Sequence, residues 1–127
     1  MLQRIQTLYL FGALIVNFLF LFVPIYTSGA TSVSITNNIA LSILSLVLNG
    51  LLLFTIFSYK NRKRQMLACK LLVIGVSAEI ILAILLVTSG SIRWNFVFPF
   101  TSIVFIIMAF RSIKRDEKLV RSADRLR

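Results

Sequence analysis

Residues 66–87 read MLACKLLVIGVSAEIILAILLV, an apolar run of twenty-two residues that contains one base, Lys70, and one acid, Glu79. Because an α-helix rises about 1.5 Å per residue, a helix of this length crosses the roughly 30 Å hydrocarbon core of a bilayer. Runs of similar character occupy residues 5–26, 39–59 and 94–110. The sequence therefore predicts an all-α fold, an integral membrane four-helix bundle, with residues 1–127 in one domain.

The composition favours the same class of protein. Hydrophobic residues make up 58 % of the chain and charged residues 14 %, whereas soluble domains contain about 45–50 % and about 25 %. Histidine is absent and cysteine occurs once, so the chain lacks the side chains for a disulfide framework or a Cys/His zinc site. No span carries paired carboxylates and no Gly-rich phosphate loop occurs, so we expect no cofactor and no enzymatic activity.

Basic residues lie almost entirely on one side of the predicted bundle. Polar loops connect the runs at residues 27–38, 60–65 and 88–93, and a tail spans residues 111–127. Thirteen of the fourteen Lys and Arg residues fall near the N-terminus, in or beside the second loop, or in the tail, whereas Arg93 falls on the other side. Since Lys and Arg are retained in cytoplasmic loops, we expect both termini in the cytoplasm. Basic chains are also typical of nucleic-acid binders, but no nucleic-acid-binding module is present, so we expect no such partner.

The first apolar run has a second interpretation. Arg4, the apolar residues after it and the small residues Ser28, Gly29 and Ala30 resemble a secretory signal peptide and its cleavage site. The apolar run of about nineteen residues is longer than the roughly 7–15 residues of a signal peptide core. We therefore expect a retained first span.

The tail carries a pattern typical of an amphipathic helix. At 100° per residue, most of its apolar residues share one arc and several bases occupy the neighbouring arc, although Asp116 falls among the apolar positions. Glu117 precedes Arg121 by four residues, the favourable order for an ion pair on a helix. We expect a cytoplasmic C-terminal helix that lies along the anionic headgroups of the inner leaflet. A helix exposed to solvent is the alternative.

A candidate intramembrane site consists of the polar residues near the middle of each span: Glu79, Asn17, Asn49 and Ser102. An ionisable residue inside a membrane is by default a functional candidate. Gly75 and Ala83, one turn on either side of Glu79, indicate a face that a neighbouring helix approaches closely. No base lies within reach of Glu79 along its helix, so we expect it to be protonated and to donate a hydrogen bond to Asn17 or Asn49. Asn49 continues a polar stripe that includes Ser45.

Three segments resemble a bacterial family of small four-span membrane proteins that is known only as a domain of unknown function. They are MLQRIQTLYL at 1–10, YKNRK at 59–63 with Gln65 and Cys69 after it, and DEKLVRSADRLR at 116–127. The resemblance implies a multi-pass protein of the bacterial inner membrane and supplies no reaction. It directs attention to a candidate cytoplasmic rim, made of Arg4, Lys60, Arg62, Lys63, Arg64, Asp116, Glu117, Arg121, Asp124 and Arg125.

Two functions are compatible with these features. In the first, the protein is a structural or accessory membrane protein, in which Asp116, Glu117 or Asp124 pairs with Arg4 or the basic loop to close the rim into a platform. That platform would bind anionic lipids of the inner leaflet, or a membrane or cytoplasmic protein. In the second, the protein is a small proton-coupled transporter that uses Glu79. The uneven charge argues against a dual-topology exporter, which needs balanced Lys and Arg.

Overall fold

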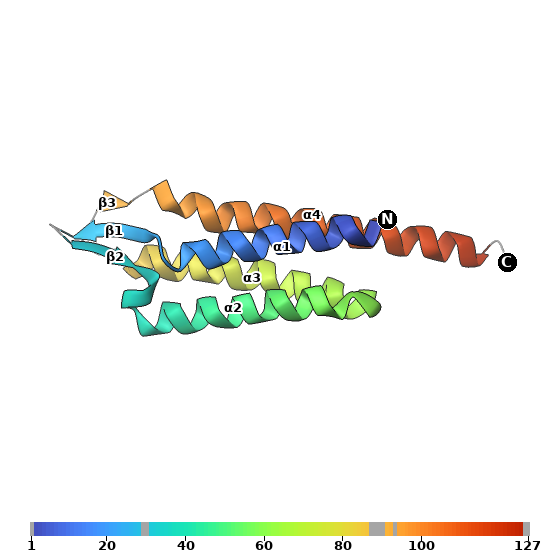
Figure 1. Ribbon diagram of the computed structural model, residues 1–127, viewed down its shortest axis with the longest axis horizontal. Coiled ribbons are helices and arrows are strands. Elements are labelled where there is room, and N and C mark those ends of the chain that lie inside the picture. The colour runs from blue at the N-terminus through green and yellow to red at the C-terminus, as the bar shows by residue number, and fades with distance from the viewer. Residues whose placement is uncertain (1, 29–30, 87–90, 93, 126–127) are drawn as a thin grey trace.

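The computed structural model describes residues 2–28, 31–86, 91–92 and 94–125 (Figure 1). Four α-helices make up most of the fold: α1 (Leu2–Phe20), α2 (Ile39–Phe57), α3 (Arg62–Leu86) and α4 (Val97–Arg125). Three short strands and three single 3₁₀ turns connect them: β1 (Pro24–Ser28), β2 (Thr31–Ser34), β3 (Ser91–Ile92), η1 (Ile35–Asn37), η2 (Ser58–Lys60) and η3 (Trp94–Phe96). The predicted all-α bundle is confirmed.

The helices lie side by side along one long axis (Figure 1). Contacts are most extensive between α1 and α4, followed by α3 with α4, α2 with α3 and α1 with α2, so the helices form a ring in chain order. Fully buried side chains fill its centre, and they include Phe20, Leu10, Leu52, Leu72 and Ile106. Large apolar residues also cover the outside of the bundle, where a membrane protein contacts lipid.

Among the described residues, three helical segments are long and apolar enough to cross a membrane: Ile39–Lys60, Arg62–Leu86 and Trp94–Arg125. The fourth helix, α1, is apolar over the shorter segment Ile5–Phe20. The prediction that the first span reaches residue 26 was wrong, because α1 ends at Phe20 and Pro24 begins a strand. Proline has no backbone N–H and disfavours helical geometry in the residue before it, so the helix ends ahead of it.

The three strands form a small antiparallel sheet in the order β2-β1-β3. Tyr26 of β1 pairs with Val33 on one side and with Ile92 on the other. The amide of Asn95 also donates a hydrogen bond to the carbonyl oxygen of Pro24 at 2.6 Å, which joins η3 to β1. The sequence predicted polar loops at residues 27–38 and 88–93. Parts of both segments instead form strands, at residues 27–28, 31–34 and 91–92. The sheet ties the α1–α2 and α3–α4 connections together, and we call this end of the molecule the sheet end.

The opposite end carries the start of α1, η2, the start of α3 and residues 111–125 of α4, and we call it the basic end (Figure 1). Helix α4 reaches this end from the other end of the bundle without interruption. It is 29 residues long, which corresponds to about 43 Å at about 1.5 Å per residue. The predicted C-terminal helix is therefore present, as a direct continuation of α4. That it lies along the headgroups of the inner leaflet stays a prediction. Residues 111–125 contain neither Gly nor Pro to end the helix, and Figure 1 shows α4 projecting past the bundle.

Candidate functional site

The four candidate intramembrane residues lie on four different helices and are all buried, none more than 7 % exposed. The hydroxyl of Ser45 on α2 donates a hydrogen bond to Oε1 of Glu79 on α3. The amide of Asn49 donates to the carbonyl oxygen of Ser45 at 2.9 Å. The predicted partners of Glu79 were therefore wrong, because Ser45, one turn before Asn49 on the same polar stripe, faces the carboxyl group instead.

The other two residues lie toward the α1–α4 contact. The hydroxyl of Ser102 on α4 donates to the carbonyl oxygen of Ala13 on α1 at 3.5 Å, and Asn17 follows Ala13 by one helical turn on the same face of α1. Within the described residues, neither polar atom of the Asn17 amide has a hydrogen-bond partner, and the same is true of Oε2 of Glu79. The hydrogen bonds thus link Glu79 to Ser45 and Ser45 to Asn49, while Ser102 is linked to α1 and the Asn17 side chain is buried without a hydrogen-bond partner among the described residues.

A close helix contact stands one turn before Glu79. An added Cβ at Gly75 of α3 would lie 2.4 Å from Cδ2 of Leu48 on α2, and Ala83, one turn after Glu79, is buried as well. The prediction that this face of α3 accepts a neighbouring helix is confirmed. Small residues on α3 let α2 approach closely enough for Ser45 to reach Glu79.

At the basic end, an ion pair joins the beginning of α3 to α4. Nη2 of Arg62 lies 3.4 Å from Oδ2 of Asp116, whose residue is 8 % exposed. This is one of the expected pairs between the tail and the basic loop, and it explains why an acid falls among the apolar positions of the tail. Gln65 adds a link from α3 to α2 by donating to the carbonyl oxygen of Thr55 at 3.3 Å.

The other rim residues are less tightly connected. Glu117 pairs with Arg121 on its own helix at 2.7 Å, and Asp124 is exposed without an ion pair among the described residues. The side chain of Arg4 lies outside the described part of the chain. Lys60, Lys63 and Arg64 are exposed around the beginning of α3, as is Arg125 near the end of α4.

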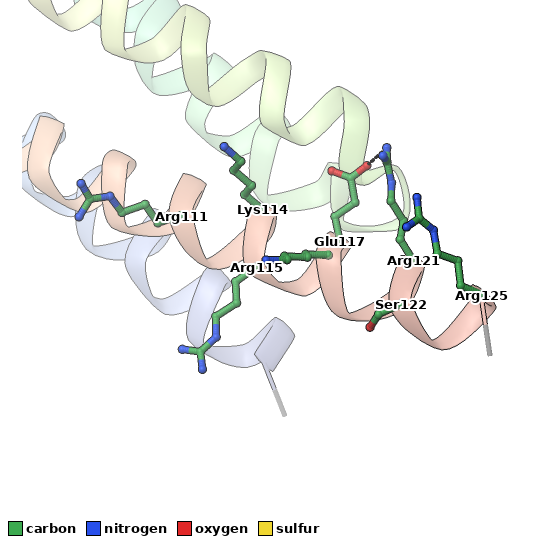
Figure 2. A pocket seen from close by; sticks show the side chains of 8 residues that line it. Arg111, Lys114, Arg115, Glu117, Arg121, Ser122 and Arg125 are labelled. Atoms are coloured by element: carbon green, nitrogen blue, oxygen red, sulfur yellow. Dashed lines mark hydrogen bonds and ion pairs between the residues drawn. The ribbon is translucent and has the colours of Figure 1, made fainter.

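Figure 2 shows how the basic side chains of the tail are arranged. Arg111, Lys114 and Arg115 leave α4 in different directions, while Arg121 folds back to meet the carboxylate of Glu117. The hollow that they line is bounded by side chains of α4 alone. This part of the tail therefore presents a broad positive surface and does not form a closed binding cavity.

Two grooves at the basic end do lie between elements. One, of about 370 Å³, runs between α3 and α4 and is lined by Lys63, Met66, Leu67, Lys70, Phe110, Lys114 and Glu117. The other lies where η2 and the beginning of α3 face the tail. Sequence reasoning missed the first groove, although the spacing of its lysines was readable. Among the described residues no group of three or more His, Cys, Asp or Glu side chains is placed to hold a metal ion.

No curated protein matches this chain, and no solved structure does. One family model, the domain of unknown function DUF4293, matches residues 2–126. This agrees with the resemblance of both chain ends and of the central basic loop to such a family. With nearly its whole length matched, the chain belongs to the DUF4293 family.

Proposed function

We propose that this protein is a non-enzymatic accessory protein of the bacterial inner membrane whose basic end binds anionic lipid headgroups or an acidic partner. The observation that carries the proposal is the ion pair between Arg62 and Asp116, which holds the α2–α3 turn and the tail together. Bases from two chain segments distant in sequence thereby share one surface. No described side chain at the sheet end is a Lys or Arg.

The charge distribution supports a single orientation in the membrane. Lys and Arg residues near the ends of spans are retained in the cytoplasm, and the anionic inner leaflet attracts each base near its surface by about 1 kcal/mol. A surface that is already ordered loses less conformational entropy on binding than a disordered tail does. The basic end is therefore suited to contact the cytoplasmic leaflet or a negatively charged protein beside it.

The orientation is tested by labelling cysteines introduced at the two ends. Ser32→Cys lies at the sheet end and Ser122→Cys in the tail, both positions are exposed, and the native Cys69 is buried. We expect a membrane-impermeant maleimide to label Ser32→Cys in intact spheroplasts, and Ser122→Cys only after permeabilisation. Labelling of Ser122→Cys in intact spheroplasts would contradict the proposed orientation.

A second candidate, a small proton-coupled transporter, is favoured by one observation. Oε2 of Glu79 is buried and lacks a hydrogen-bond partner among the described residues, which leaves one carboxyl oxygen available to a proton or a transported group. The alternative role for Glu79 is to hold α2 against α3, since an interhelical hydrogen bond in a membrane contributes about 0.6 kcal/mol.

Infrared spectroscopy separates these roles, with Glu79→Gln used to assign the carboxyl band. We expect a neutral carboxyl band, because the residue is fully buried and no described base pairs with it. Ser45→Ala should shift this band by removing the hydrogen bond to Oε1, whereas Ser77→Ala, whose hydroxyl bonds to its own helix, should not. Reversible conversion of the band to a carboxylate would favour the transporter.

A further inference from the structure

The groove between α3 and α4 combines positive charge with an apolar floor. Lys63 and Lys70 come from one face of α3, and Lys114 comes from the facing side of α4. The lining residues of each helix are three or four positions apart, so each set lies on one helix face. The sets are residues 63, 66, 67 and 70 on α3, and residues 110, 114 and 117 on α4. The groove is therefore a property of two facing helix surfaces.

The floor of the groove is formed by Met66, Leu67 and Phe110. Nζ of Lys70 lies 6.0 Å from the centre of the Phe110 ring, so the positive charge of Lys70 lies over the aromatic part of this floor. One turn farther along α3, Ile74 is 66 % exposed and continues the apolar surface away from the basic end. A ligand that matches this surface carries an anionic group next to an apolar chain.

The acid that lines the groove does not cancel the charge of its lysines. The carboxylate of Glu117 is engaged by Arg121 at 2.7 Å, so the three lysine ammonium groups keep a net positive potential at the groove. The nearby ion pair between Arg62 and Asp116 ties α3 to α4, which fixes the distance between the lysines of the two helices before any ligand binds.

We propose that the α3–α4 groove binds the phosphodiester headgroup of an anionic phospholipid, with an acyl chain along the apolar surface of α3 beyond Lys70. Basic pockets between membrane-spanning helices on the cytoplasmic side are suited to phosphate-bearing headgroups. The inference rests on the proposed function, because it requires the basic end to face the cytoplasmic leaflet. It goes further by assigning one ordered lipid to three lysines.

The test measures retention of phosphatidylglycerol and of phosphatidylcholine by the full chain in mild detergent, using native mass spectrometry. The groove variant carries Lys63→Gln, Lys70→Gln and Lys114→Gln. A matched variant removes the same charge outside the groove through Lys60→Gln, Lys118→Gln and Arg125→Gln. We expect the groove variant to bind phosphatidylglycerol about tenfold more weakly than the matched variant. Replacing the three groove lysines with arginine should preserve phosphatidylglycerol binding. That result would also show that the fold tolerates substitution at these positions.

Each other outcome has a defined meaning. If both variants weaken phosphatidylglycerol binding equally, the groove is not the lipid site. The proposed function would still stand, because binding would then depend on the overall positive charge of the basic end. If the wild-type chain does not prefer phosphatidylglycerol over phosphatidylcholine, two claims are wrong: that the groove binds an anionic lipid, and that the basic end binds anionic lipid headgroups. Displacement of the lipid by soluble glycerol phosphate at equal concentration would identify a site for free phosphate esters and would overturn the assignment to lipid.

Discussion

Gly75→Leu is expected to destabilise the bundle by about 1–3 kcal/mol, the typical effect of overpacking a close-packed contact. A Cβ at this position would lie 2.4 Å from Cδ2 of Leu48, and the leucine side chain adds three more carbon atoms in the same space. Helices α2 and α3 would have to separate, which also lengthens the distance between Ser45 and Glu79. Gly75→Ala should have a smaller effect, because the end of the Leu48 side chain is able to move.

Gly50 supplies the matched control. It also lies within a helix, but an added Cβ would have no heavy atom within 4 Å and the residue is exposed. Gly50→Leu removes the same backbone flexibility and gains helix propensity, by somewhat less than the roughly 0.8–1.0 kcal/mol that separates Gly from Ala, without a clash. Reversible unfolding in mixed micelles compares the two variants. If Gly75→Leu is as stable as Gly50→Leu, the close contact between α2 and α3 is wrong.

Asp116→Lys is expected to release the tail from the α2–α3 turn. It removes the acceptor of Arg62 and places a second base beside it at a residue that is 8 % exposed. Exposed ion pairs contribute about 0–1 kcal/mol and disruption of fully buried ones costs about 3–5 kcal/mol. Because the Arg62 side chain is 30 % exposed, we expect an intermediate loss of about 1–3 kcal/mol.

The measurement is the distance between spin labels attached at Asn61→Cys and Val120→Cys, residues that line the same groove. The distance distribution should broaden in Asp116→Lys. Asp124→Lys makes the same charge change at an exposed position and should leave the distribution unchanged. The double variant Arg62→Asp with Asp116→Arg exchanges the two charges of the ion pair and should restore the narrow distance distribution. A distribution that is equally narrow in Asp116→Lys would show that the tail is held by other contacts.

Much of the architecture was predictable because it depends on properties that are local in the sequence. The lengths of the apolar runs predicted the number of helices, and the absence of Gly and Pro after residue 110 agrees with a helical tail. The connection between α1 and α2 was predicted less well. The strand at Pro24–Ser28 is stabilised by pairing with residues 31–34 and 91–92, and such pairing has no periodic signal in segments this short.

The candidate sites show the same division. The position of Glu79 among apolar residues, and the polar stripe that contains Ser45, were visible in the sequence. The hydrogen bond between them joins residues 34 positions apart and depends on how α2 and α3 are rotated about their axes. Likewise, Asp116 disturbed the amphipathic pattern of the tail, and only the position of Arg62 explains why.

By itself, the sequence determined that the chain forms apolar helices of membrane-spanning length and that nearly all of its bases fall in a few segments. The tertiary structure decided which of these segments meet. It put Ser45 against Glu79, joined Arg62 to Asp116, and set three lysines around one apolar groove between α3 and α4. The physical reason is that helix formation and charge content are local properties of the chain, whereas hydrogen bonds and ion pairs between helices depend on their packing.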